Sequence, residues 1–373
     1  MTDRLLDRRR LLGGAGAAGL SLALGACAPR APLTSTVANA GLCLPRVDAS
    51  SDRLIRSVAG LRPYREHGFV VREQRLGDTR VIHNYGHGGG GITLSWGSSR
   101  LAVDLGLVGH KGPVAVLGAG ALGLTTAKLL QEAGLAVRIY AETLPPHTTS
   151  NIAGGQVNPT TVFRRSVASD AFVRQFEAAM DYSYRRFQIS VGEDTGVRWH
   201  TTYDAMRERP LSDFEKRIMP DARVLRAGEH PFPVPVVREW RTMYVETGRW
   251  LAHLMREVRI GGATIERRRM ETPAEIEALP EGLVFNCTGL GARALFGDRG
   301  MIPIRGQLAI LLPQPEVQHA YTGPMGYMFP RPDGILLGGT FERGEENPTP
   351  QPEDIARIIA AHAAFNRGMS CTA

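Results

Sequence analysis

Apolar residues recur at strand-like and helical spacing along most of the chain. The clearest unit spans residues 114–142, where an apolar run at 114–117 leads into a glycine turn, a helix that stops at Gly134, and a second apolar run at 136–140. A strand, a turn, a helix and another strand in this order predict a parallel strand–helix–strand unit.

Other segments extend this pattern in both directions. Strand-like runs at 68–73 and 79–83 precede a predicted helix at about 98–107, and several runs broken by Pro and Gly over 301–341 are typical of an antiparallel sheet. Two stripes of large apolar residues at helical spacing predict amphipathic helices that pack on a core: Phe172, Phe176, Met180, Tyr184 and Phe187, then Trp250, Leu251, Leu254, Met255 and Val258. Together these elements predict an α/β protein with a second, mixed or antiparallel sheet.

The amino-terminal residues predict a targeting signal. Residues 7–12 resemble a twin-arginine export motif, and the small-residue, apolar stretch that follows ends in Leu24-Gly-Ala-Cys27, which resembles a lipobox. We expect cleavage before a lipidated Cys27, hence a periplasmic or cell-envelope protein that is lipid-anchored. Residues 28–50, rich in Ala, Pro, Ser and Thr, predict a tether.

Composition narrows the class of protein. A chain of 373 residues with 43% hydrophobic and 22% charged residues is long enough for two globular lobes. The net charge of +7 raises the question of nucleic-acid binding. The arginines are dispersed and no nucleic-acid-recognition motif is present, so we exclude this class of function. The cysteines are too few and too scattered for a disulfide framework, and no metal-ligand spacing occurs.

The glycine turn after the first apolar run has the spacing of a nucleotide-binding motif. Gly118, Gly120 and Gly123 lie between an apolar strand and a helix, with Ala119, Ala121 and Leu122 between them, and Glu142 closes the next strand. Such glycines permit a tight turn, backbone approach to a pyrophosphate and close helix packing, while the acid accepts hydrogen bonds from a ribose diol. The pattern predicts a dinucleotide that lacks a 2′-phosphate.

A second glycine-rich segment lies before this turn. Residues 81–97, which contain His83-Asn-Tyr-Gly-His-Gly-Gly-Gly-Gly91, resemble the signature near the carboxyl end of D-amino-acid oxidases, and the fingerprint resembles the amino-terminal start of that family. Blocks at 60–65, 140–155, 285–289, 305–307 and 337–340 resemble the family too. The two ends have exchanged places, which indicates circular permutation through the linker 108–113.

The resemblance implies FAD as the cofactor and oxidative deamination of D-amino acids, by hydride transfer, to 2-oxo acids, ammonia and H2O2 from O2 or another acceptor. It implies an FAD-binding part at 51–160 and 265–300, in which the signature at 51–107 precedes the unit at 113–160, and a substrate part at 161–264 and 301–366. Further FAD contacts are implied at Thr148, Thr149, Ser150, Gly154, Gly155, Met270, Thr288, Gly88, Gly91, Ile92 and Thr93.

The resemblance also implies how substrate is bound. Arg62 would bind the carboxylate, the Gly89 carbonyl would receive the amine, and Tyr327 would reinforce the carboxylate contact. Where the family has another tyrosine, this chain has Gly323, with Tyr321 the nearest substitute, so side-chain preference stays open. We interpret His83 and His87 as structural.

Three other readings remain open. The flavin chemistry could be glycine or secondary-amine oxidation, or dehydrogenation with a membrane acceptor. A non-catalytic lipoprotein that binds a nucleotide is an alternative of another class. A homodimer is compatible with each of them.

Overall fold

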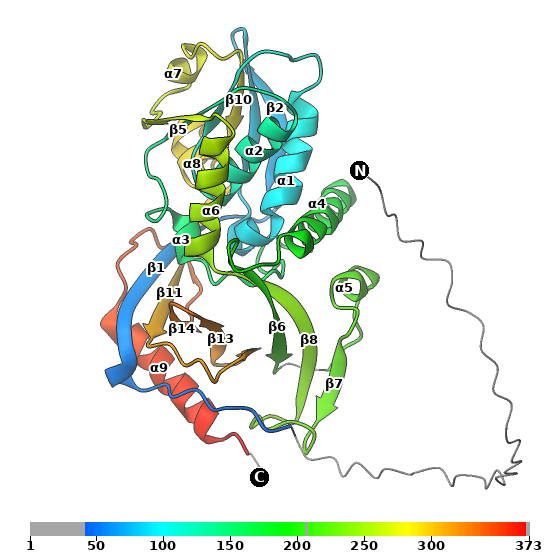
Figure 1. Ribbon diagram of the computed structural model, residues 1–373, viewed down its shortest axis with the longest axis vertical. Helices are drawn as coiled ribbons and strands as arrows, with labels where there is room; N and C mark the ends of the chain where they lie inside the picture. The colour runs from blue at the N-terminus through cyan, green and yellow to red at the C-terminus, as the bar shows by residue number, and fades with distance from the viewer. Residues whose placement is uncertain (1–41, 206–207, 371–373) are drawn as a thin grey trace, which may run out of the picture. The chain divides into compact units, whose positions relative to one another are not determined.

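Two β-sheets organise the described residues, 42–205 and 208–370, of this computed structural model (Figure 1). The first sheet has six strands in the order β2 (Val70–Leu76), β3 (Thr79–Tyr85), β10 (Leu283–Asn286), β4 (Val114–Leu117), β5 (Val137–Ala141) and β9 (Thr264–Arg267). All neighbours run parallel except β2 and β3. The predicted strand–turn–helix–strand unit therefore forms the middle of this sheet, as β4, α2 and β5.

Long helices pack beside the six-stranded sheet. They are α1 (Gly91–Gly106), α2 (Ala121–Glu132), α4 (Asp170–Ile189) and α6 (Thr247–Ile260). Helix α1 contacts α2 and α4, and α2 contacts α6. Both predicted apolar stripes lie in α4 and α6 and are buried, so they are core positions. The short helices are η1 (Ser51–Arg53), η2 (Gly88–Gly90), α3 (Thr149–Ile152), α5 (Asp213–Ile218), α7 (Pro273–Glu277) and α8 (Gly291–Leu295).

The second sheet has nine strands and is mixed. Its order is β1 (Leu54–Arg65), β11 (Met301–Leu311), β14 (Gly334–Gly338), β13 (Gly326–Arg331), β12 (His319–Gly323), β6 (Val197–Asp204), β8 (Val236–Val245) and β7 (Arg223–Arg226), with β15 (Glu342–Arg343) beside β11. Only β12 and β6 run parallel. Helix α9 (Pro352–Arg367) packs on β11 and β14.

Helix α1 begins seven residues earlier than the sequence pattern predicted, at Gly91 rather than near Ser98. Glycine disfavours helix interiors, so the glycines at 88–91 and Gly97 give no local signal for this earlier start. Tertiary contact overrides that preference, because a β-carbon at Gly97 would lie 1.8 Å from the Ala179 carbonyl oxygen of α4. The glycine run therefore leads straight into the helix.

The amino-terminal part also differs from expectation. Strand β1 pairs with β11 in the nine-stranded sheet, although we assigned its residues to the FAD-binding part. The expected tether is wrong for its last residues, because Val47 and Ala49 are buried and the Val47 amide donates to Asn366 of α9. Cys43 is disulfide-bonded, against the expectation of no disulfide framework.

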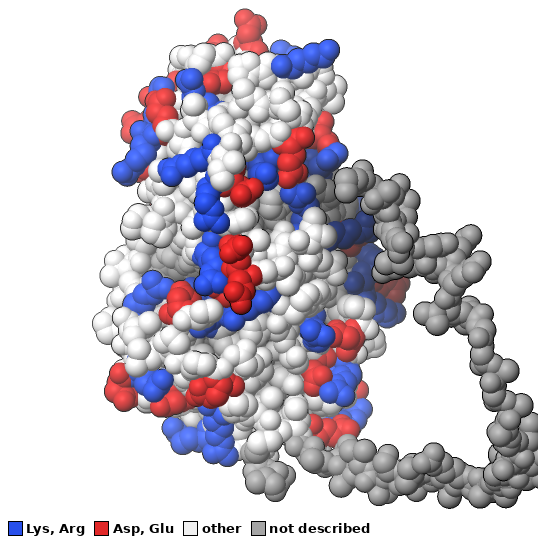
Figure 2. Space-filling view, in the orientation of Figure 1, with Lys and Arg blue, Asp and Glu red and all other residues white. Residues whose placement is uncertain are grey.

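Charged side chains of both signs lie on the surface. On the face shown in Figure 2, basic and acidic side chains are interspersed. Within 42–205 and 208–370, no helix is long and apolar enough to cross a membrane, and no cluster of three or more metal-ligating side chains occurs. The predicted signal, Cys27 and most of the tether lie outside the described residues.

Candidate active site

A cavity of about 1200 Å³ is lined by residues from both sheets. Every residue that the sequence singled out for cofactor or substrate lines it, except Gly123. The glycine run and the fingerprint, which α1, the linker 107–113 and β4 separate in sequence, line the same cavity. The two signatures therefore lie together in space.

Two glycines of the fingerprint are required by the turn itself. Gly118 has φ +101°, and a β-carbon there would lie 2.7 Å from the Cys287 carbonyl oxygen. A β-carbon at Gly123 would lie 1.9 Å from the Gly118 carbonyl oxygen, so Gly123 lies behind the turn. Helix α2 starts at Ala121, and its first amides are free of intrahelical partners and face the cavity. This is an anion-binding geometry suited to a pyrophosphate.

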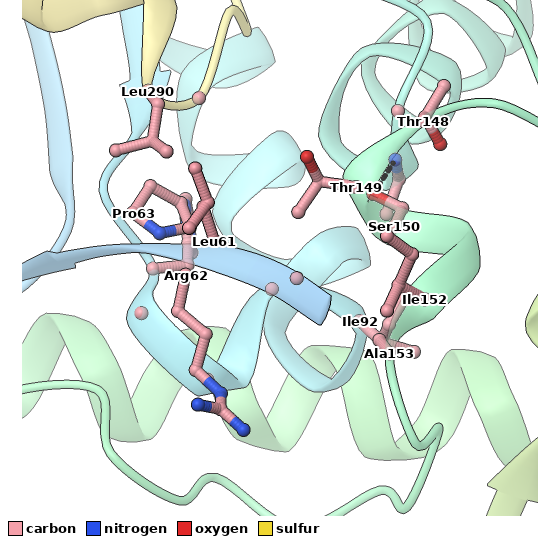
Figure 3. Close-up of a pocket in the computed structure, with 18 of the residues that line it drawn as sticks. Leu61, Arg62, Pro63, Ile92, Thr148, Thr149, Ser150, Ile152, Ala153 and Leu290 are labelled. Carbon is pink, nitrogen blue, oxygen red and sulfur yellow. Dashed lines mark hydrogen bonds between the residues drawn. The ribbon is translucent and has the colours of Figure 1, made fainter. Parts of the chain in front are cut away.

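The segment around α3 lies opposite this turn. The Ser150 hydroxyl accepts a hydrogen bond of 3.0 Å from the Ala121 amide, drawn in Figure 3. The Thr148 hydroxyl donates to Asn151 and caps α3, so its role is structural as well. At Gly154 and Gly155 the Cβ space is occupied by the Phe329 ring and the Val245 carbonyl oxygen. Contacts within the protein, rather than flavin approach, already require these two glycines.

The far end of the cavity carries the predicted ribose contact. Glu142 follows β5, as the sequence indicated, and accepts a 3.1 Å hydrogen bond from Arg269. Met270 lies beside this arginine and Thr288 follows β10. Glu142 is exposed, so this ion pair is weak and a ribose hydroxyl can compete for the carboxylate.

The glycine run fits a planar ligand at one position in particular. Protein atoms occupy the Cβ space at the first three glycines: at Gly88 and Gly89 atoms of Thr161 lie 2.2 and 2.1 Å away, and at Gly90 Val162 lies 2.6 Å away. At Gly91 the nearest atom lies 3.8 Å away. Gly91 lines the cavity at the start of α1. Because Gly91 has no side chain, space is left for a ligand there, and no protein atom fills that space.

This difference gives a prediction for Gly91→Ala. We expect the protein to be stabilised by roughly 0.5–1 kcal/mol, because alanine is the better helix former, while FAD dissociation rises at least about tenfold, because the methyl group overpacks the ring. The Kd for FAD and the free energy of unfolding of the apoprotein measure the two effects.

Gly248→Ala is the matched control, since Gly248 is also near a helix start and no atom lies within 4 Å of its Cβ position. It should gain stability and keep its affinity for FAD. Equal FAD affinity in both variants would place the ring elsewhere.

Arg62 and Tyr327 meet in the part of the cavity that the nine-stranded sheet forms. Figure 3 shows the Arg62 side chain extending from β1, with Leu61 and Pro63 on the other side of the strand. The guanidinium crosses Gly306 of β11, where a β-carbon would lie 2.3 Å from its nitrogens. It donates to the Thr340 carbonyl oxygen at 3.4 Å. Burial raises the pKa of Tyr327, and its hydrogen bond with Arg62 opposes that rise.

Tyr321 cannot replace the missing second tyrosine. Its ring is fully buried on the opposite face of β12, where the hydroxyl meets His362 Nδ1 at 3.0 Å and accepts a hydrogen bond from Asn366. Side chains alternate along a strand, so Thr322 and not Tyr321 faces the cavity. Only two residues separate Gly323 from β13, so the connection between β12 and β13 is a tight turn.

The two histidines of the signature are structural. His83 is buried and contacts Gln74 and Asn286, both at 3.0 Å, and burial lowers its pKa to about 4. His87 stacks on Phe69, with ring centroids 4.7 Å apart, and burial lowers its pKa to about 3. Both imidazoles are therefore neutral near pH 7.

Sequence motifs missed four residues of this region. Phe329 stacks on Tyr327 with ring centroids 4.6 Å apart, and Gln156 donates to the Tyr244 hydroxyl at 2.7 Å. Asp204 and Thr322 also line the cavity. The alternation of β13 could have indicated Phe329, two residues after Tyr327, but no local pattern indicates the others.

Comparison with known proteins identifies the family. A family described as FAD dependent oxidoreductase matches residues 36–105 and 113–365. A D-amino-acid oxidase of Streptomyces coelicolor is 31% identical over 68% of this chain and 78% of its own length, and a human D-aspartate oxidase is 26% identical over 68% and 75%.

Solved structures agree at the level of fold. A glycine oxidase from Geobacillus kaustophilus superposes with a TM-score of 0.52 at 17% identity over 71% of this chain and 81% of its own, and an L-proline dehydrogenase from P. horikoshii with 0.51 at 15% over 69% and 78%. The fingerprint, the glycine run and the matched residues all belong to one cavity. The chain is thus a member of the FAD dependent oxidoreductase family, an amino-acid-oxidase-like enzyme whose cofactor is FAD.

Proposed function

We propose that this enzyme oxidises D-amino acids to 2-oxo acids, with release of ammonia and with O2 as electron acceptor. The observation that carries the proposal is the Arg62–Tyr327 pair in the same cavity as the nucleotide turn. A guanidinium binds a carboxylate through two parallel hydrogen bonds, and charge-assisted bonds contribute about 1.5–3 kcal/mol each. The Tyr327 hydroxyl donates a further bond to the same carboxylate.

Backbone groups complete the substrate site. The Gly89 carbonyl oxygen accepts a hydrogen bond from the substrate amine, which orients the α-carbon. Negative charge that develops during oxidation is stabilised by the first amides of α1, which have no intrahelical acceptor and carry the positive end of the helix dipole. Thr93 links the start of α1 to the segment 156–158, because its hydroxyl donates to the Gln156 and Asn158 carbonyl oxygens.

FAD supplies the hydride acceptor when bound. The amides at the start of α2 hold its pyrophosphate, Glu142 holds the ribose, and Gly91 leaves space for the ring. Burial lowers the pKa of His83 and of His87, so both imidazoles are weak bases, which favours direct hydride transfer from the α-carbon.

We also propose that the chain is a circular permutant of this family. The family match breaks at 106–112, which overlaps the linker 107–113 between α1 and β4. The proposed cut falls between α9 and β1, and the two flanking segments lie together, since the Val47 amide donates to Asn366 Oδ1 and the Arg46 guanidinium donates to the Met369 carbonyl oxygen. Chain ends that lie side by side are what a permutation leaves.

Export by the twin-arginine route with lipid anchoring at Cys27 is proposed on the sequence signals. The disulfide at Cys43 supports an oxidising compartment. Cys27→Ala should move the protein from the membrane fraction to the soluble envelope fraction. An unchanged distribution would exclude a lipid anchor at this residue.

The function is tested with purified holoenzyme and a panel of matched D- and L-amino acids. We expect anaerobic loss of the visible flavin absorbance, and peroxide formation in air, with D- and not L-enantiomers. Reduction by glycine or secondary amines alone would favour the corresponding oxidase, and reduction without peroxide would favour a dehydrogenase. A protein that holds FAD but is reduced by none of these substrates would exclude the proposal.

A further inference from the structure

The cavity wall carries one carboxylate on the nine-stranded sheet, Asp204 at the end of β6. Arg62 is the only other charged residue of this sheet among the described residues that line the cavity. The remaining carboxylates of the wall, Glu142 and Glu271, both pair with Arg269 near the proposed ribose contact. Asp204 is therefore the only acid in the described lining that faces the substrate end of the cavity.

Strand register places Asp204 in line with the proposed carboxylate site. Tyr327 of β13 is paired with Thr322 of β12, and Thr322 is paired with Asp204 of β6. Paired residues on neighbouring strands project to the same face of a sheet. Neighbouring strands lie about 4.8 Å apart, so the backbones at Tyr327 and Asp204 are separated by roughly 10 Å across the cavity face.

The contacts of Asp204 leave its charge directed at the cavity. Its carboxylate accepts hydrogen bonds from the Trp240 indole at 2.8 Å and from the Thr322 hydroxyl, both neutral donors. Two arginines also act on Asp204 by their positive charge: Arg238, which donates to the Arg209 carbonyl oxygen, and Arg209, which binds Glu215. Burial raises the pKa of Asp204, whereas the two neutral donors and the two arginines favour its ionised form. The neutral donors orient this carboxylate at the cavity wall.

We propose that Asp204 is a specificity-determining residue that binds the cationic side chain of D-amino acids such as D-lysine and D-arginine. This inference rests on the proposed function. With the α-carboxylate on Arg62 and Tyr327, an extended side chain that runs across Thr322 advances roughly 1.3 Å per bond. The five bonds from the α-carbon of lysine to its ammonium nitrogen therefore cover about 6.5 Å, and a hydrogen bond of about 3 Å reaches the Asp204 carboxylate.

Asp204→Asn is the variant of choice. The amide oxygen can still accept from Trp240 and the amide nitrogen can donate to Thr322, so the fold of the wall is kept while the charge is lost. Asp333→Asn is the matched control. Asp333 lies in the exposed turn between β13 and β14 and binds Arg331 outside the cavity.

Two measurements on holoenzyme separate this inference from the proposed function. The first is kcat/KM for D-lysine against D-norleucine, which has the same chain length without the charge. We expect Asp204→Asn to lower the value for D-lysine at least about tenfold through KM, with kcat nearly constant, and to leave D-norleucine within about twofold. Equal losses for both substrates, or no preference in the wild type, would overturn the assignment.

The second measurement needs no turnover. The flavin spectrum reports binding of 6-aminohexanoate and hexanoate, which carry the carboxylate with and without the distal ammonium group. The wild type should bind 6-aminohexanoate more tightly, and Asp204→Asn should abolish the difference. This result would support the cation site even if no D-amino acid were oxidised, and absence of any preference in the wild type would reject the site even if D-norleucine were a good substrate.

Discussion

Arg62→Ala is expected to raise the KM for amino-acid substrates at least about a hundredfold, because loss of one partner of a desolvated charge pair costs roughly 3 kcal/mol or more. The Arg62 guanidinium lies against Gly306 and Tyr327 in the cavity, so alanine leaves the substrate carboxylate without a cationic partner. Steady-state kinetics with a D-amino-acid substrate measure the effect.

Two variants make this result specific. Arg62→Lys keeps the charge but loses the bidentate geometry, so an intermediate KM is expected. Arg56→Ala is the control on the same strand, because Arg56 is exposed and binds Asp333 outside the cavity, and its KM should not change. Flavin content should stay constant in all three variants. An unchanged KM for Arg62→Ala would remove this residue from the substrate site.

Acidification from pH 7 to pH 4 is expected to unfold the protein. Burial lowers the pKa of His83, His200, His319 and His362 from 6.5 to about 4 each. The unfolded chain binds these protons at higher pH than the native state, so stability is fully present above pH 6.5 and is lost as pH falls toward 4. Each group contributes on the order of 3 kcal/mol, and together they approach the stability of an ordinary domain.

The measurement is the free energy of unfolding by denaturant between pH 7.5 and 4. His319→Phe is the informative variant, since His319 lies among the rings of Tyr203, Phe232 and Tyr321 and its Nε2 lacks a hydrogen-bond partner in the described structure. It should reduce the loss of stability on acidification by about 3 kcal/mol. His147→Gln, at an exposed position, should leave the profile unchanged. A flat profile in the wild type would contradict the argument.

The nucleotide-binding half was readable from sequence because its constraints are local. Gly118 requires a positive φ, and the turn lies between a short, fully apolar strand and an amphipathic helix, both of which show in the local sequence. The helix start at Gly91 was misplaced for the opposite reason. Glycine propensity is a local property, whereas the contact of Gly97 with α4 is made across the fold.

By itself, then, the sequence determined the α/β class, the strand–turn–helix unit, the glycine-rich signatures and the arginine expected to bind a carboxylate. Tertiary structure decided which strands are neighbours and which face of each strand lines the cavity. Strand β1 lies in the nine-stranded sheet, and Asp204 is in register with Thr322 and Tyr327. Tyr321 lies on the face away from the cavity. Turns and periodicities depend on residues close in sequence. Sheet order depends on packing between segments far apart in sequence, such as β1 with β11 and β6 with β12, which no local pattern records.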